Sequence, residues 1–158
     1  MPEDPKLLRI LLVDDDPDCA ESVAALLKRA GDVDEVLVAY NGRDALGVVE
    51  DFAPDLVIID VGLPDLDGHE LARRLRGSMV TDACAIVALS GYDQPEDERH
   101  GLDAGFDAYM VKPIDVEDLA TVVAKMVADG RSGLIKHKPP ARLGRWADRR
   151  PLPSLKKR

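Results

Sequence analysis

Hydrophobic residues recur along this chain in short runs, separated by longer stretches with helical periodicity. The runs are four to seven residues long and consist mostly of leucine, valine, isoleucine and alanine. Consecutive apolar positions are typical of strands that are buried on both faces, as in a parallel sheet covered by helices. The predicted strands are Leu7–Val13, Val36–Ala39, Leu56–Ile59, Ala85–Leu89 and Ala108–Val111.

The stretches between and after these runs predict five helices. Capping residues or proline mark several of their starts, and glycine follows most of their ends. The predicted helices are Pro17–Ala30, Arg43–Asp51, Asp67–Arg76, Pro95–Ala104 and Asp115–Ala128. Strands that alternate with helices in this way predict an α/β doubly wound sandwich of five βα units with right-handed crossovers.

The charge of the chain changes sign at Asp129-Gly130. Residues 1–130 carry 29 acidic and 11 basic side chains, a net charge of −18, whereas residues 131–158 carry a net charge of +9. We therefore expect one domain over 1–130 and a basic, proline-containing tail over 131–158 that is largely disordered. The acidic domain should not bind nucleic acid through its own surface. For the tail, nucleic acid, an anionic membrane, an acidic partner and the acidic domain itself remain open.

Several sequence features favour a cytoplasmic protein. No apolar run approaches the roughly 20 residues of a membrane-spanning helix. The first residues are acidic and proline-rich, unlike a secretory signal. The two cysteines, Cys19 and Cys84, do not form a CxxC motif and are expected to be buried free thiols.

Polar residues follow four of the five predicted strands. They are Asp14 and Asp15 after the first strand, Asp60 after the third, Ser90 after the fourth and Lys112 after the fifth. Because the carboxyl ends of parallel strands share one edge, these side chains should converge. Each of these residues alone has an ordinary structural explanation, such as a capping turn, a loop start or a surface lysine. Their joint occurrence at successive strand ends favours a functional site.

Such a cluster has a definite chemistry. Three crowded carboxylates repel one another, and a hard divalent cation such as Mg²⁺, which prefers oxygen ligands, relieves that repulsion. Lys112 would add a fixed positive charge and Ser90 a hydroxyl donor. Together these groups could bind a phosphoryl group, which a carboxylate such as Asp60 can accept as an acyl phosphate.

Four segments resemble the receiver domains of two-component response regulators, the CheY-like superfamily. Together they extend through residues 7–129, and they occur in the family's order and at suitable spacing. They are Leu11–Asp16, Asp55–Gly68, Ile86–Gly91 and Gly105–Pro113. The resemblance implies a flavodoxin-like fold with strand order 2-1-3-4-5, and it implies two-component phosphorelay signalling. One small departure is Leu63, which stands where many members have methionine.

The resemblance also implies roles for particular residues. Asp60 would be phosphorylated, and Mg²⁺ would be bound by Asp15, Asp60 and the backbone carbonyl of Gly62, with Asp14 acting mainly through metal-bound water. The phosphoryl oxygens would contact Ser90 and Lys112, and the aromatic ring of Tyr109 would change rotamer as Ser90 moves. In this family the Lys-Pro bond is usually cis, so we predict a cis Lys112-Pro113 bond, and we give Asp16 only a peripheral place.

The leading interpretation is a stand-alone response regulator that receives its phosphoryl group from a histidine kinase or a histidine phosphotransfer protein. Phosphorylation would remodel the face formed by residues 95–128, which an unidentified output protein reads. We expect no DNA-binding domain and no transmembrane segment; a dimer stays open. The chain would act as a switch that catalyses its own phosphotransfer and dephosphorylation rather than as an enzyme.

Two alternatives belong to other classes. A pseudo-receiver would bind partners without phosphorylation, but the intact set of acidic residues, Ser90 and Lys112 argues against it. A Mg²⁺-dependent phosphatase of haloacid-dehalogenase type also uses an aspartate nucleophile. That family has a second aspartate two residues later, where this chain has Gly62.

Overall fold

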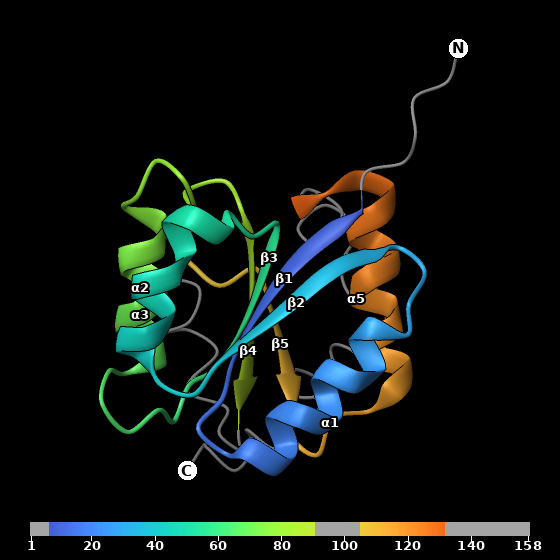
Figure 1. Cartoon of the computed structure of the whole chain (residues 1–158), viewed down its shortest axis with the longest axis horizontal. Helices are drawn as coiled ribbons and strands as arrows, with labels where there is room; N and C mark the ends of the chain where they lie inside the picture. Colours follow the sequence, from blue (N-terminus) through green and yellow to red (C-terminus); the bar gives the residue numbers. More distant parts are fainter. Residues whose placement is uncertain (1–6, 91–104, 132–158) are drawn as a thin grey trace, which may run out of the picture.

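The computed structural model describes residues 7–90 and 105–131, which form a five-stranded parallel sheet covered by helices on both faces (Figure 1). The strand order is β2-β1-β3-β4-β5, as expected for a doubly wound fold. The strands are β1 (Leu8–Val13), β2 (Val33–Ala39), β3 (Leu56–Asp60), β4 (Ala85–Ser90) and β5 (Ala108–Val111).

The helices divide between the two faces of the sheet. In Figure 1, α1 and α5 lie on one side of the strands, and α2 and α3 lie on the other. Their bounds are α1 (Pro17–Lys28), α2 (Gly42–Phe52), α3 (Gly68–Arg76) and α5 (Val116–Asp129). The helix predicted at Pro95–Ala104, the predicted disorder of the tail and the first six residues lie outside the described residues.

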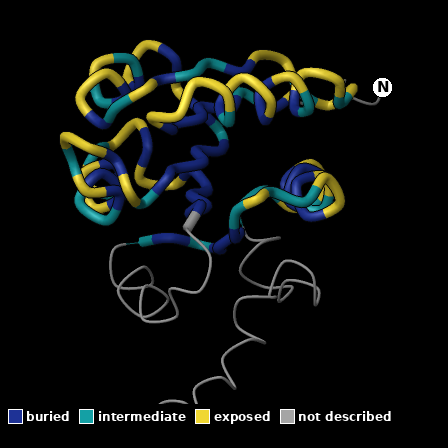
Figure 2. Tube along the Cα trace, turned by 90° about the horizontal axis from the view of Figure 1, so that it is seen from below, coloured by how far each residue is buried: buried dark blue, intermediate teal, exposed yellow. Residues whose placement is uncertain are grey.

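Each strand contributes to two separate cores, because successive side chains of a strand point to opposite faces of the sheet. Ile10 and Leu12 of β1 pack in the core under α1 and α5. Leu11 and Val13 pack in the core under α2 and α3. Figure 2 shows buried backbone through the centre of the molecule and exposed residues on its outer surface. The sheet is therefore covered on both sides, as the continuous apolar runs predicted.

Four helices begin at capping side chains, and these caps fix the residue at which each helix starts. Asp16 accepts hydrogen bonds from backbone N–H groups at the start of α1, and Asn41 does the same for α2. Asp67 and Asp115 cap α3 and α5. Each cap satisfies an N–H group that the first helical turn leaves without a partner. The cap on α1 also gives Asp16 a structural role at the rim of the predicted site.

The largest difference from the predicted elements concerns β2, which begins at Val33 rather than Val36. The apolar run that predicted this strand begins only at Val36, because Asp34 and Glu35 before it are charged and exposed. They are tolerated because β2 is an edge strand, which pairs with β1 alone. Among the described residues, no helix has both the length and the apolar character needed to span a membrane.

Candidate functional site

The residues singled out from the sequence gather at the carboxyl edge of the sheet. Asp14 follows β1, Asp60 ends β3 and Lys112 follows β5. Parallel register holds these ends level, since Val13 pairs with Ile59 and Asp60 pairs with Leu89. The backbone of Ser90 ends β4 and pairs with Val111. The strand topology thus brings together residues that are up to about a hundred positions apart in sequence.

Lys112 joins the two buried carboxylates of the site. Its Nζ atom donates a hydrogen bond to Asp60 Oδ2 at 3.0 Å and lies 3.2 Å from Asp14 Oδ2. Asp14 is fully buried, and Asp60 is 9 % exposed. Among the described residues, Asp14 Oδ2 receives no hydrogen bond of good geometry, although its charge is paired. This carboxylate therefore has coordination capacity left for a further ligand.

The Asp60 carboxylate is held from the other side by the loop that follows it. The backbone N–H of Gly62 donates to Asp60 Oδ1 at 2.9 Å. Gly68, at the start of α3, packs directly on this strand end, because a Cβ atom there would lie 2.6 Å from Val61 Cα and 2.9 Å from the Asp60 carbonyl oxygen. Any side chain at position 68 would push α3 away from the site.

Burial and charge shift the ionisation of these groups. Desolvation raises the pKa of Asp14, and its hydrogen bond from the Asp16 N–H and the charge of Lys112 only partly offset this. Desolvation by itself would lower the pKa of Lys112, but its hydrogen bond to Asp60 and the charges of Asp60 and Asp14 raise it overall. Lys112 is therefore a permanent cation between the two carboxylates.

A cysteine thiol lies beside the buried aspartate. Burial, followed by the neighbouring Asp14 carboxylate, raises the pKa of Cys19 to about 11, so its thiol stays protonated. Burial also raises the pKa of Cys84 to about 11. Both cysteines are free; Cys84 is buried as expected, and Cys19 is half-buried. Neither has the lowered pKa of a reactive thiol.

The carboxylate cluster fits a hard divalent cation. Oxygen atoms of Asp14, Asp15 and Asp60 all lie within 4.8 Å of one another, and Asp15 is exposed to solvent. An all-oxygen set of this kind, open on one side to water, suits Mg²⁺, which retains water ligands when bound. The Gly62 N–H holds one Asp60 oxygen in place; binding of a cation by the Gly62 carbonyl stays a prediction.

Tyr109, the predicted switch residue, lies in the core under α2 and α3 and is 4 % exposed. Its ring meets that of Phe106 edge to face, with centroids 5.6 Å apart. The Lys112-Pro113 peptide bond is cis, as predicted. Ser90 is placed here by its backbone alone, so its contact with Tyr109 stays a prediction.

Sequence reasoning missed the residue that ties the β3–α3 loop to α2. Asp65 accepts hydrogen bonds from the N–H groups of Gly42 at 2.9 Å and Arg43 at 3.1 Å. These bonds lower the pKa of Asp65, the bond from Gly42 most of all. The signal was present in Asn41-Gly42, which opens α2, but nothing in the sequence paired that turn with a residue 23 positions away.

Known proteins share this fold and much of this sequence. Residues 10–124 match the family model for the response regulator receiver domain. The chain is 41 % identical over 122 residues to the two-component response regulator ORR41 of Oryza sativa subsp. japonica, covering 76 % of this chain and 94 % of that protein. It is 42 % identical to the gliding motility regulatory protein of Myxococcus xanthus over 77 % of this chain, but spans only 15 % of that protein.

Solved structures give the same result. A putative response regulator from Chloroflexus aurantiacus J-10-fl is 33 % identical, with a TM-score of 0.72, covering 78 % of this chain and 99 % of that one. A CheY-like receiver domain protein from Methanospirillum hungatei JF-1 is 30 % identical, with a TM-score of 0.71, covering 78 % of this chain and 96 % of that one. The chain therefore belongs to the response regulator receiver domain family of two-component signalling proteins.

Proposed function

We propose that this chain is a phosphoacceptor switch in which Asp60 receives a phosphoryl group from a histidine kinase or a histidine phosphotransfer protein. One carboxylate oxygen of Asp60 attacks the phosphorus atom of a phosphohistidine. The nitrogen–phosphorus bond breaks, its electron pair returns to the imidazole, and an acyl phosphate forms on Asp60. The switch would respond to its kinase and not turn over a separate substrate.

The observation that supports this proposal is the position of Lys112. Its ammonium group lies 3.0 Å from Asp60 Oδ2 and is also paired with buried Asp14. An incoming phosphoryl group needs a cation that is already in place, because charge builds on its oxygens during transfer. Lys112, with a raised pKa, supplies that charge without a proton change. Ser90, at the end of the neighbouring strand, would contact a phosphoryl oxygen.

Mg²⁺ would be held by Asp15, Asp60 and the carbonyl oxygen of Gly62, with Asp14 binding through water. When bound, the ion would neutralise charge on the phosphoryl oxygens. The convergence of three carboxylates within 4.8 Å supports this assignment. Asp14 and Asp60 would orient the site, and the Gly62 N–H would hold Asp60 in place.

The output step would pass through Tyr109. Ser90 would move toward the phosphoryl group, and the Tyr109 ring would fill the space it leaves. That change would remodel the face formed by the segment before β5, β5 itself and α5, and an output protein would read it. The position of Tyr109 on β5, next to the strand that Ser90 ends, supports this route.

Labelling with acetyl phosphate and Mg²⁺ tests the proposal. The wild-type chain should gain one phosphoryl group, measured by intact mass, and Asp60→Asn should gain none, because an amide is no nucleophile for this reaction. Asp82→Asn is the matched control: it changes an exposed aspartate in the α3–β4 loop and should label normally. Wild-type labelling of Asp60→Asn would refute Asp60 as the acceptor.

A further inference from the structure

A concave feature lies at the amino edge of the sheet, opposite the acidic site. It is a pocket of about 600 Å³. Its lining comes from the start of β1, the segments that precede β3 and β4, and the end of α5. We call it the basal pocket; its apolar lining includes Leu8, Ala53, Pro54, Val80, Met126 and Val127. Val80 and Val127 are 44 % and 38 % exposed. An apolar rim of this kind favours an occupant over water.

The chain itself enters this pocket after α5. Gly130 and Arg131 both line it, and Gly130 has a φ of 64°, which turns the backbone at the end of the helix. Arg131 is then fixed by its side chain, because its Nε atom donates to Asp107 Oδ1 at 3.0 Å. The described part of the chain therefore ends at the basal pocket.

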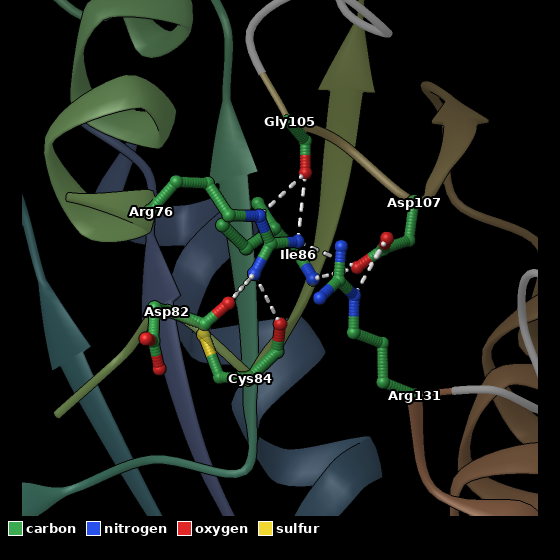
Figure 3. A network of polar contacts seen from close by, with 7 residues as sticks. All are labelled: Arg76, Asp82, Cys84, Ile86, Gly105, Asp107 and Arg131. Carbon is green, nitrogen blue, oxygen red and sulfur yellow. Dashed lines mark hydrogen bonds and ion pairs between the residues drawn. The ribbon is translucent and has the colours of Figure 1, made fainter. Parts of the chain in front are cut away.

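The anchor that holds Arg131 is buried and itself hydrogen-bonded. Asp107 is 4 % exposed at its side chain, and its Oδ2 atom accepts from Arg76 Nη2 at 2.8 Å and from the Ile86 N–H at 2.9 Å (Figure 3). Arg76 also donates to the carbonyl oxygens of Gly105 and Cys84. Arg131 binds the other oxygen of the same carboxylate, Oδ1, so the two guanidinium groups clamp Asp107 (Figure 3).

We propose that residues 132–138 of this chain occupy the basal pocket, with Leu134 and Ile135 against its apolar lining. Leu134 and Ile135 follow Arg131 by three and four residues, so they lie at most roughly 10–14 Å from it along the chain. Leu134 and Ile135 are adjacent large aliphatic residues in an otherwise basic, proline-rich segment. Their burial would cover Val80 and Val127.

Charge favours the same occupant. Asp55 and Arg131 both line the pocket, so its lining has no net charge, but the domain up to residue 130 has a net charge of −18. Lys136 and Lys138 follow the two aliphatic residues directly, within a segment of net charge +9. An apolar pair followed by lysines matches an apolar pocket in a domain of net negative charge.

The chain's own segment has an advantage over any second molecule. It is tethered at Arg131, so its effective concentration at the pocket is on the order of millimolar without any further contact. Docking of this segment does not depend on phosphorylation of Asp60, because the basal pocket and the acidic site lie at opposite edges of the sheet. The two proposals can therefore fail separately.

Limited trypsin digestion of the full chain tests the docking. The bond after Lys136 should be cut about tenfold more slowly than the bond after Arg145, because cleavage requires the docked segment to open. Val80→Ser/Val127→Ser removes the apolar rim without new charge and should raise the rate at Lys136 several-fold. Leu134→Ser/Ile135→Ser removes the occupant's side chains and should act in the same way.

Val116→Ser is the matched control, since Val116 is exposed on the same helix but does not line the basal pocket. It should leave the rate at Lys136 unchanged, and circular dichroism should show that every variant is folded. Equal cleavage after Lys136 and Arg145 in the wild type would overturn the proposal. So would protection that neither double variant relieves, or protection that rises with protein concentration, which would identify a second copy as the occupant.

Discussion

Buried carboxylates form ion pairs of opposite stoichiometry at the two edges of the sheet. At the carboxyl edge, two carboxylates, Asp14 and Asp60, share one ammonium group, that of Lys112. At the amino edge, one carboxylate, Asp107, is shared by two guanidinium groups, those of Arg76 and Arg131. Both arrangements join distant parts of the chain through ion pairs. The first has an excess of negative charge and the second an excess of positive charge.

The difference separates a site from a structural clamp. Both oxygens of Asp107 accept hydrogen bonds from described residues, namely Arg76, Arg131 and the Ile86 N–H. Asp14 Oδ2 accepts none of good geometry from the described residues, and desolvation raises the pKa of Asp14. A satisfied carboxylate stabilises the fold, whereas an unsatisfied one costs stability and is available to a ligand.

Removing the satisfied carboxylate should have the largest effect. Asp107→Ala leaves the Arg76 guanidinium, 16 % exposed, without its counter-charge and the Ile86 N–H without its acceptor. We expect the free energy of unfolding to fall by about 3–5 kcal/mol, as for other broken buried ion pairs. Urea denaturation followed by circular dichroism would measure it.

Glu70→Gln is the control for that experiment. Glu70 pairs with Arg73 and Arg74 on the exposed surface of α3, and such pairs contribute only about 0–1 kcal/mol. If Asp107→Ala lost no more stability than Glu70→Gln, the amino-edge network would be a surface ion pair and not a clamp.

A substitution at the carboxyl edge should have a smaller effect of opposite sign. Asp14→Asn removes a fully buried charge whose desolvation is only partly compensated, and Lys112 keeps Asp60 as a partner. Without divalent cations at pH 7, the free energy of unfolding should rise by about 1 kcal/mol. Added Mg²⁺ should stabilise the wild type more than the variant, in thermal melts with and without MgCl₂. A loss of stability without Mg²⁺ would contradict an unsatisfied Asp14.

The smallest expected effect concerns the loop beside the site. The lowered pKa of Asp65 means that the folded state favours its ionised form, so its stabilisation is present above the unfolded value of 3.8. That stabilisation is lost as the pH falls through the folded pKa. Asp65→Asn should therefore lower the Tm at pH 7, and the difference should disappear in acid.

Glu50→Gln is the matched control, because it removes the same charge from an exposed position on α2. A Tm difference between the wild type and Asp65→Asn that persisted below the folded pKa of Asp65 would show that the contacts with Gly42 and Arg43 do not depend on the charge of Asp65.

The sequence predicted the fold and much of the site because both depend on local patterns. All five strands and four of the helices lie where the apolar runs and caps placed them, within a few residues. Asp14, Asp60 and Lys112 could be singled out because each stands directly at or after a buried strand, and the ends of parallel strands meet. The start of β2 was missed, because an edge strand need not be apolar.

The ion pairs of Asp107 with Arg76 and Arg131 could not be predicted from local sequence patterns. Asp107 lies between a glycine-containing loop and β5, and it resembles any turn aspartate in sequence. Its partners Arg76 and Arg131 are 31 and 24 residues away; Arg76 ends α3, and Arg131 follows the end of α5. Arg131 also belongs to the segment that composition assigned to a disordered tail. Charge composition cannot tell a solvated arginine from one that is bound to a buried carboxylate.

The sequence by itself determined the strand–helix alternation, the two cores and the set of acidic and basic residues at the strand ends. Periodicity and capping are local, and they carry this information within each element. Only the tertiary structure decided that Lys112 pairs with two carboxylates while Asp107 pairs with two arginines. Ionisation and hydrogen-bond satisfaction depend on burial and on distances between residues far apart in the chain, which no local pattern specifies.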